Sequence, residues 1–177
     1  MAKFEQVSRF TEELPLPTRA TAHAAGYDLY AAEDKVIPSY LHLMEKADIK
    51  EIDGQPCQYI LSDMATFTKI TGIKPSLVST GMKIKLADDE YLELLVRSST
   101  PLKYWLVLAN STGIIDSDYY NNSGNEGEIF LQLINFSPAD LVIKKGDCIG
   151  QGIIHKYYTI EDDCAGGERQ GGLGSTH

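Results

Sequence analysis

The stretch LVSTGMKIKL, residues 77–86, alternates apolar and polar side chains over much of its length, which is the pattern of a half-buried strand. After an Asp-Asp turn, YLELLV at residues 91–96 forms a second apolar run of strand length. Three further runs of this kind follow at residues 105–109, 129–136 and 149–154. Helical patterns do not alternate with these runs, so the sequence predicts an all-β barrel or sandwich.

Finer expectations follow for this β-rich part. Pro101 is expected to close the strand that begins at Tyr91, because proline cannot donate to a β-ladder. WLVLA at residues 105–109 is expected to be a buried run. Residues 141–143 and 149–154, on either side of the turn Lys145-Gly146-Asp147, are expected to pair as a closing hairpin.

The N-terminal part predicts an edge strand and a loop that enters a second strand. Residues 3–10 alternate as an edge strand does, and the prolines of LPLP (14–17) then break regular structure. The small residues before Gly26 favour a loop whose backbone can approach a ligand closely. Asp28, on the strand that follows, then faces either a metal with its waters or only solvent.

Residues 36–75 differ in character from the rest. Good helix formers predict a helix at residues 40–47, and residues 57–61 and 62–65 suggest a strand and a second short helix. The periodicity is weak and nothing in the segment looks catalytic. We therefore interpret residues 1–177 as one domain with an insert at approximately 39–73 and a C-terminal arm at approximately 165–177.

The charge balance constrains the partners. The 177 residues carry 16 Lys and Arg against 25 Asp and Glu, for a formal net charge of −9. Such a field repels polyanions and argues against a broad surface for a nucleic-acid polymer. An anionic small molecule stays compatible with this charge if a few arginines and a divalent cation act at contact distance.

Cysteines, histidines and the N-terminus indicate no zinc site, disulfide framework or membrane segment. The three cysteines, Cys57, Cys148 and Cys164, show no C-x-x-C spacing, so reduced thiols are expected. No apolar run approaches membrane-spanning length, and MAKFEQVSRF lacks the apolar core of a signal peptide. A cytoplasmic protein is expected.

NSTGIIDSDY, residues 110–119, combines an amide, a glycine turn, two carboxylates and an aromatic ring. The apolar pair before Asp116 is expected to place that carboxylate at the lip of a pocket, where it can act as a general base on a water. Asn110 can read a flat polar ring through its amide. The alternative is an ordinary Asx-rich turn that bonds only local backbone.

The glycine-dense tail, GGERQGGLGSTH at 166–177, has the composition of a lid that wraps phosphate, because glycines expose backbone N–H groups and Arg169 adds a planar cation. The alternative is a disordered terminus.

Five short motifs, taken in order, are more specific than any of these signals alone. They are AAGYDLYAAED (24–34), VRSS (96–99), NSTGIIDSDYYNNSGNEGEI (110–129), KGDCIGQGI (145–153) and ERQGGLGST (168–176). In this order they resemble the five motifs of the trimeric deoxyuridine triphosphate nucleotidohydrolases, the dUTPases.

The resemblance implies a jelly-roll β fold, a homotrimer and active sites at the subunit interfaces. It implies hydrolysis of dUTP to dUMP and pyrophosphate with Mg²⁺, by attack of a water on the α-phosphorus. Such an activity limits uracil in DNA and supplies dUMP for thymidylate synthesis.

Roles for individual residues also follow from the resemblance. Asp116 matches the water-activating carboxylate, Asn110 with the backbone of Gly113, Ile114 and Ile115 matches the uracil pocket, and Tyr119 matches the ring under the deoxyribose. Asp28 matches the carboxylate that meets Mg²⁺ through water, with the triphosphate supplying most direct ligands. Phosphate contacts and the closing arm are matched by Arg97, Ser98, Ser99, Gln151, Arg169, Leu173, Gly174, Ser175 and Thr176.

Three features depart from the family pattern. Leu173 stands where an aromatic usually stacks on uracil, which removes part of a stacking contribution of about 1 kcal/mol. Residues 121–126 form an extra loop after Tyr119, and the segment near 36–75 is longer than usual. We hypothesise that this insert packs on the outside of the barrel or binds a protein partner.

Two rival functions fit the sequence less well. A dCTP deaminase needs a glutamate where this chain has Gln132, and an amide cannot shuttle the proton. A catalytically silent nucleotide-sensing trimer does not need Asp116, Arg97 and Arg169, and all three are present.

Overall fold

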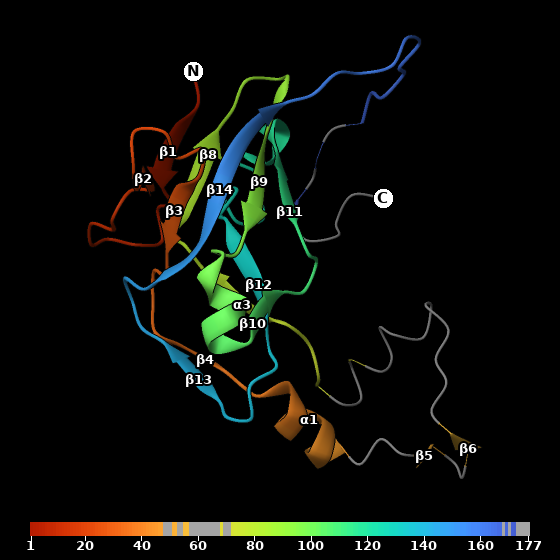
Figure 1. Ribbon diagram of the computed structural model, residues 1–177. Coiled ribbons are helices and arrows are strands. Elements are labelled where there is room, and N and C mark those ends of the chain that lie inside the picture. The colour runs from red at the N-terminus through yellow and green to blue at the C-terminus, as the bar shows by residue number, and fades with distance from the viewer. Residues whose placement is uncertain are drawn as a thin grey trace.

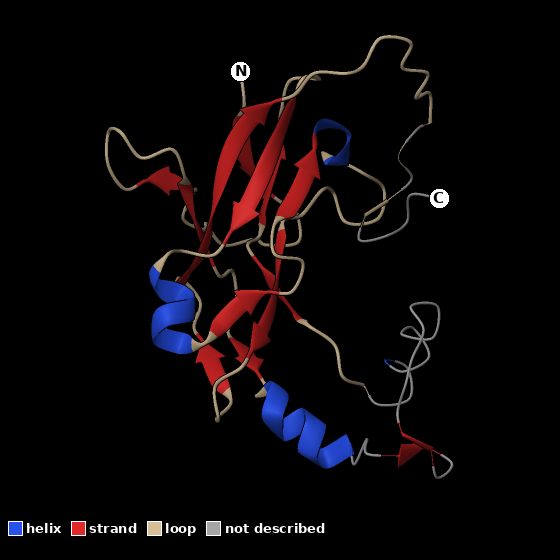
Figure 2. Ribbon diagram, turned by 45° about the vertical axis from the view of Figure 1, so that its right-hand side comes forward, coloured by secondary structure: helices blue, strands red, loops and turns tan. Residues whose placement is uncertain are grey.

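Strands dominate the computed structural model, which describes residues 1–47, 51–52, 55–56, 68, 72–167, 169 and 171–172 (Figures 1 and 2). The helices are α1 (Tyr40–Ala47) and α3 (Ser99–Tyr104), with a 3₁₀ turn, η2, at Ser117–Tyr119. The strands are β1 (Lys3–Gln6), β2 (Thr18–Arg19), β3 (Tyr27–Tyr30), β4 (Lys35–Ile37), β5 (Glu51–Ile52), β6 (Gln55–Pro56), β7 (Ser76–Ser79), β8 (Met82–Lys85), β9 (Glu90–Leu95), β10 (Leu106–Leu108), β11 (Gly113–Asp116), β12 (Phe130–Asn135), β13 (Leu141–Ile143) and β14 (Cys148–Lys156).

The largest sheet has five antiparallel strands in the order β11-β9-β14-β3-β2. A three-stranded sheet, β10-β12-β7, and the pairs β1-β8 and β13-β4 complete the body. In Figure 1 the long strand β14 runs between β3 and β9, in agreement with its pairing to both. The all-β prediction is confirmed.

The core lies between these sheets and is built by alternation. In β9, Leu92 and Leu94 are 0% and 2% exposed, whereas the alternate residues Tyr91, Glu93 and Leu95 are only partly buried. Leu131 and Leu133 of β12 meet them in the same apolar cluster. Burying each such side chain contributes about 1.5–3 kcal/mol, which fixes which face of each sheet points outward.

Glycines in β14 permit the close approach of neighbouring strands. A Cβ on Gly150 would lie 2.7 Å from the backbone oxygen of Leu95 and 2.4 Å from Cδ2 of Leu131. A Cβ on Gly152 would lie 2.8 Å from Leu92 Cδ1. The register of β14 against β3 also shifts between Cys148 and Gly150, so glycine here marks an irregular and tightly packed strand.

Two predictions in the N-terminal half are confirmed, and others lie outside the described residues. Helix α1 spans the expected residues 40–47, and a loop through Gly26 enters strand β3. The strand predicted at 57–61 and the short helix predicted at 62–65 lie outside the described residues.

Three local predictions in the C-terminal half are wrong. Pro101 lies in the first turn of α3, where its missing N–H costs nothing, and β9 has already ended at Leu95. Trp105 is 63% exposed, with φ of 54° at the C-cap of α3, so the buried run is reduced to Leu106 and Leu108.

The third error concerns the expected hairpin at the end of the barrel. Strand β13 pairs with β4, and β14 pairs with β3 and β9. The turn Lys145-Gly146-Asp147 therefore carries the chain from one sheet to another, with Gly146 at φ 86°.

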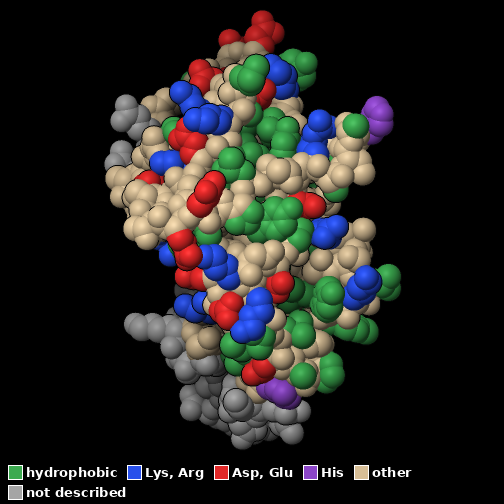
Figure 3. Space-filling model, turned by 90° about the vertical axis from the view of Figure 1, so that its left-hand side faces the viewer, with side chains coloured by type: hydrophobic (Ala, Val, Ile, Leu, Met, Phe, Trp, Pro, Cys, Tyr) green, Lys and Arg blue, Asp and Glu red, His purple; other side chains and the backbone are tan. Residues whose placement is uncertain are grey.

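Charges of both signs share the face shown in Figure 3, where basic and acidic side chains are interspersed among hydrophobic ones. Among the described residues, no helix combines the length and the apolar character needed to span a bilayer.

Candidate active site

Asp28, Arg97 and Gln151 come together at one end of the five-stranded sheet, and we call them the phosphate-end group. Gln151 of β14 stands directly opposite both Asp28 of β3 and Leu95 of β9, so these residues share one face of the sheet. Arg97 follows β9 and places its Nε 3.8 Å from Oδ1 of Asp28. The Asp28 side chain is 17% exposed and the Arg97 side chain 46%, so the cation is the more accessible of the two.

Gly26 lies beside this group. A Cβ on residue 26 would lie 2.3 Å from Oε1 of Gln151, so the glutamine amide rests directly against the backbone before β3. The approach of a ligand to this backbone stays a prediction.

The start of helix α3 adds polar groups next to Arg97. Ser98 stands at its N-cap and forms no side-chain capping hydrogen bond within the described part of the chain. Ser99 lines a cavity of about 530 Å³ together with Arg97, Lys103 and Cys148. Burial, with the negative charge of Asp28 nearby, raises the pKa of the Cys148 thiol. Lys103, which was not predicted as a site residue, lies one helical turn after Ser99 and adds a second cation.

Asp116 ends strand β11 at the opposite end of β9. It stands opposite Tyr91, which in turn stands opposite His155 of β14. The Tyr91 and His155 rings stack with centroids 5.2 Å apart, and His155 Nε2 lies 2.9 Å from a Glu93 carboxylate oxygen. The Asp116 side chain is 51% exposed, and it is not among the residues that line the cavities at Tyr40, Asn125 and Ser99.

Arg169 of the C-terminal arm binds two carboxylates of this region. Its Nη2 donates to Oδ2 of Asp116 at 2.5 Å and its Nε donates to Oδ1 of Asp118 at 2.7 Å. The Arg169 side chain is only 16% exposed, whereas both carboxylates are about half exposed. The arm thus lies against residues 110–119 of its own chain. Asp118, which was not predicted as a site residue, helps to hold it there.

Tyr119 lies beside these carboxylates and is 5% exposed. Its hydroxyl donates to the Glu128 carbonyl at 3.0 Å and accepts from Asn125 Nδ2 at 2.7 Å. Burial raises the pKa of the phenol. Gly172 of the arm covers the ring, because a Cβ there would lie 2.3 Å from Cε2 of Tyr119. We call Asp116, Asp118, Tyr119 and Arg169 the base-end group, after the general base expected at Asp116.

The remaining residues predicted for the uracil pocket lie around the start of β11. Asn110 is exposed in a tight turn, in which the Thr112 N–H donates to the Asn110 carbonyl at 2.6 Å. Gly113 is buried opposite Leu94 of β9. Ile114 is 52% exposed on the outer face, whereas Ile115 packs against the core.

The phosphate-end and base-end groups are separated along the sheet. Asp116 is level with Tyr91, and Gln151 is level with Leu95, which puts the two groups about 13 Å apart along β9 alone. The register therefore places the two groups at opposite ends of β9.

The described carboxylates do not form a metal cage. Within the part of the chain that the structure describes, no group of three or more His, Cys, Asp or Glu side chains is arranged to hold an ion. Asp28 offers one carboxylate beside Arg97. This donor set fits a Mg²⁺ ion that keeps its waters and takes its direct ligands from a polyphosphate.

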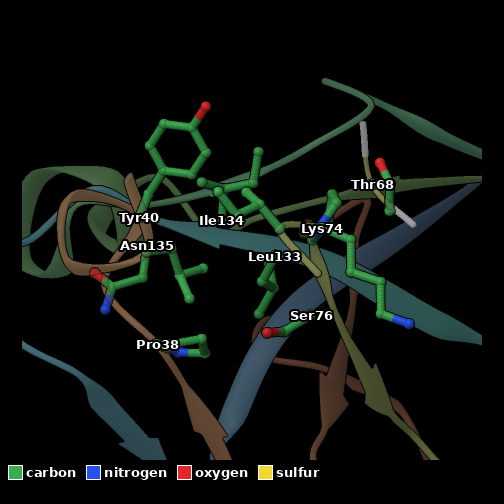
Figure 4. Close-up of a pocket in the computed structure, with 11 residues that line it drawn as sticks. Pro38, Tyr40, Thr68, Lys74, Ser76, Leu133, Ile134 and Asn135 are labelled. Atoms are coloured by element: carbon green, nitrogen blue, oxygen red, sulfur yellow. The ribbon is translucent and has the colours of Figure 1, made fainter. Parts of the chain in front are cut away.

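One apolar cavity lies away from both groups, at the base of the segment predicted to be an insert (Figure 4). It has a volume of about 190 Å³ and is lined by side chains from α1, from β12 and from the residues before β7. Tyr40, Leu133 and Lys74 are among them, and none of the predicted site residues is.

Comparison with known proteins identifies the family. The dUTPase family model matches residues 61–172 of the chain. A deoxyuridine 5'-triphosphate nucleotidohydrolase from Lactococcus lactis subsp. lactis is 35% identical over 176 residues, which span 98% of this chain and 95% of that protein. The chain belongs to the dUTPase family. The family resemblance seen in the five sequence motifs is therefore confirmed.

Solved dUTPases share the fold. The crystal structure of the Streptococcus mutans dUTPase is similar with a TM-score of 0.68 at 36% identity, covering 89% of this chain and 98% of that chain. The dUTPase of phage phi11 of S. aureus, at 17% identity, has a TM-score of 0.61 and covers 93% and 96%. The predicted jelly-roll β fold is confirmed by these neighbours of the dUTPase family.

The dUTPase motifs are thus placed at two ends of one sheet face. The predicted arm residues Leu173, Gly174, Ser175 and Thr176 lie outside the described residues. Asp118, Lys103 and Asn125 lie at these groups as well, although they are not among the residues predicted from the sequence. Asp118 lies in the third sequence motif, two residues after Asp116, and this spacing could have indicated it as a site residue.

Proposed function

We propose that this chain hydrolyses dUTP to dUMP and pyrophosphate by attack of a water on the α-phosphorus. Its membership of the dUTPase family supports the reaction, and the two residue groups on the sheet support the division of labour. The phosphate-end group positions the triphosphate, and the base-end group supplies the general base, Asp116.

The observation that carries the proposal is the separation of the two groups on one face of β9. A water activated by Asp116 must attack a phosphorus held by Arg97, yet their strand positions lie roughly 13 Å or more apart. A second copy that brings its Asp116 to the Arg97 of the first resolves this separation. We propose that the active form is a homotrimer, as the family resemblance implies, with each site at a subunit interface.

The outer face between the two groups suits such an interface. Ile114 is 52% exposed there, and Tyr91 and His155 form a stacked pair beside Asp116. An apolar and aromatic strip bordered by polar groups is the usual composition of a subunit interface.

At the base end, Asp116 accepts a proton from the attacking water. In the structure its Oδ2 accepts a hydrogen bond from Arg169, so movement of Arg169 frees this oxygen as a further acceptor for the water. We propose that the γ-phosphate draws Arg169 away, since a triphosphate carries more negative charge than the two carboxylates and forms bidentate pairs with guanidinium. Asp118 then keeps Arg169 close to the site between turnovers.

At the phosphate end, Arg97 neutralises phosphate charge, with Gln151 on the α-phosphate side and the Ser98 and Ser99 hydroxyls as donors. Lys103 adds a cation at the wall of the adjoining cavity. Asp28 orients the water shell of Mg²⁺, and the ion supplies charge neutralisation on the triphosphate when it is bound.

The first part of residues 110–119 binds the nucleobase, and the last residue of this stretch contacts the deoxyribose. Asn110 and the backbone of Gly113 to Ile115 bind the uracil edge, and the Tyr119 ring excludes a 2'-hydroxyl. The arm, with Arg169, Leu173, Gly174, Ser175 and Thr176, closes over the bound nucleotide.

We also propose that residues 1–177 form one domain located in the cytoplasm, with an insert at 39–73 that binds a protein partner. Deleting this insert tests the partner hypothesis. If the variant keeps its trimer, its activity and every interaction of the intact chain, the hypothesis is removed.

Pyrophosphate release measured with dUTP, dCTP, dTTP and UTP tests the proposed function. Release from dUTP alone is the expected result, because it requires both the uracil pocket and the exclusion of the 2'-hydroxyl. Ammonia release from dCTP would overturn the proposal and favour the deaminase.

A further inference from the structure

The extra loop at residues 121–126, together with Gly127 that follows it, contacts Tyr119 at three points. Asn122 Nδ2 donates to the Tyr119 carbonyl at 2.9 Å, and its Oδ1 accepts from the backbone N–H of Gly124 at 2.9 Å. Gly127 has φ of 80°, and a Cβ there would lie 2.5 Å from the same carbonyl oxygen. The third point is the Asn125 amide on the Tyr119 hydroxyl.

The orientation of the Asn125 amide is fixed by its neighbours. Its Oδ1 accepts from the Gly127 backbone N–H at 3.1 Å and from Asn122 Nδ2 at 2.8 Å. A backbone N–H can only donate, so the oxygen must face Gly127 and the Nδ2 group must face Tyr119. Asn125 Nδ2 therefore donates to the Tyr119 hydroxyl, at 2.7 Å.

The Tyr119 hydroxyl is held from two directions. It accepts from Asn125 and donates to the Glu128 carbonyl, at 3.0 Å. The loop is anchored to the body of the protein, because Lys83 Nζ lies 2.6 Å from Asn121 Oδ1 and 3.1 Å from Glu126 Oε2. The anchored loop thus fixes the position of the ring along its own long axis.

We propose that Asn125 is a positioning residue for sugar discrimination, acting through the hydroxyl of Tyr119. The inference rests on the proposed role of Tyr119 as the ring that excludes a 2'-hydroxyl. Exclusion of one oxygen atom depends on ring placement to within a fraction of an ångström, and a misplacement of about 1 Å can change a rate by about two orders of magnitude. The loop that departs from the family pattern is, in this view, part of the specificity apparatus.

Asn125→Asp is the sharpest test variant. It keeps the oxygen that accepts from Gly127 and Asn122, and it replaces the donor that faces Tyr119 with a carboxylate oxygen. The negative charge that this change adds is also added by the control variant in the same loop. The ratio of kcat/KM for dUTP to that for UTP is expected to fall about tenfold, the size of one hydrogen bond between buried groups. The Asn125 hydrogen bond lowers the pKa of Tyr119. Deprotonation of the Tyr119 hydroxyl should therefore occur at higher pH in the variant.

Asn121→Asp is the matched control in the same loop. Asn121 accepts from Lys83 and an aspartate does the same, and its φ of 57° is tolerated by Asp as well as by Asn. The control should leave the dUTP to UTP ratio within about twofold of the parent. Asn125→Ala serves as a second variant of the test position if Asn125→Asp does not fold.

A double-mutant cycle with Tyr119→Phe separates positioning from general stability. Once the hydroxyl is gone, Asn125→Asp should change the ratio no further. If Tyr119→Phe and Tyr119→Ala both leave the ratio unchanged, the proposed role of Tyr119 fails. If the Tyr119 variants alter the ratio and folded Asn125 variants do not, or if Asn125→Asp acts equally in both backgrounds, the inference about Asn125 is overturned.

Discussion

Asp116 and Asp118 share the guanidinium of Arg169, but the proposed chemistry assigns them different tasks. Asp116 ends strand β11 in register with Tyr91, so the sheet sets its position. Asp118 lies in the 3₁₀ turn η2 and holds Arg169 at 2.7 Å through Nε. A base must face the water, whereas an anchor must only keep the arm near.

Asp116→Asn is expected to retain nucleotide binding while kcat falls by about two to four orders of magnitude, because an amide cannot take the proton of the water. Steady-state hydrolysis and equilibrium binding of a non-hydrolysable dUTP analogue measure the two effects separately.

Asp118→Asn is the control for this variant, since it also weakens the contact with Arg169 and lies two residues away. We expect a much smaller loss of kcat for it. Equal losses in the two variants would mean that pairing with Arg169, and not base catalysis, explains the effect of residue 116.

Residue roles could be read from the sequence where they depend on motif order, and not where they depend on loop closure. Asp28 and Gln151 were predicted as site residues, and the structure brings them together by strand pairing. The bond from Asn125 to Tyr119 was missed, because it exists only once Gly127, at φ 80°, turns the loop back.

Among the elements, β14 holds the largest sheet together and depends on glycine to do so. Gly150→Ala is expected to destabilise the protein by about 1–3 kcal/mol, because the new methyl group would meet Leu131 Cδ2 at 2.4 Å and the Leu95 carbonyl at 2.7 Å. Gly167→Ala is the matched control, since nothing lies within 4 Å of a Cβ there, and it should change stability by less than about 0.5 kcal/mol. Urea denaturation of both variants measures the difference, and equal midpoints would refute the packing argument.

The segment after β1 is joined to the residues before β12 by a partly buried ion pair that no motif predicted. Arg9 donates from Nε and Nη2 to both oxygens of Glu128, each at 2.7 Å, and Ser79 also bonds this carboxylate. The Glu128 side chain is 3% exposed and the Arg9 side chain 45%.

Arg9→Ala is expected to cost about 2–3 kcal/mol of unfolding free energy, because it leaves a buried carboxylate without its counter-charge; the exposure of Arg9 keeps the estimate at the low end. Arg9→Lys should lose less, since it keeps the charge but not the two-pronged geometry. Chemical denaturation distinguishes these variants, and an Arg9→Ala protein as stable as the parent would show that Glu128 finds water or another partner.

Element types were more predictable than element partners. Alternation in β9 gave both the strand and its buried face, because the period of two is local. The hairpin expected around Gly146 is wrong because β13 pairs with β4, roughly a hundred residues earlier in the chain, and no local pattern records such a pairing. Trp105 is apolar and still 63% exposed, since the end of α3 turns it outward at φ 54°.

At the scale of the whole molecule, the negative net charge and the proposed anionic substrate are compatible. The net negative charge repels polyanions at long range. Arg97 and Lys103 line one cavity and Arg169 lies beside Asp116, where each cation can contact a bound anion directly. The motif order in the sequence suggested that neighbouring chains share a site. The position of the two groups at opposite ends of β9 in one chain supports this proposal.

Complementation between two inactive variants tests the shared site most directly. Asp116→Asn disables the base end and Arg97→Ala disables the phosphate end, and each homotrimer should release almost no pyrophosphate from dUTP. Trimers reassembled from an equal mixture contain sites that draw an intact Asp116 from one chain and an intact Arg97 from the other. We expect about a quarter of the parent activity to return for random mixing. If the mixed trimers stay as inactive as the separate variants, each site lies within a single chain and the account is contradicted.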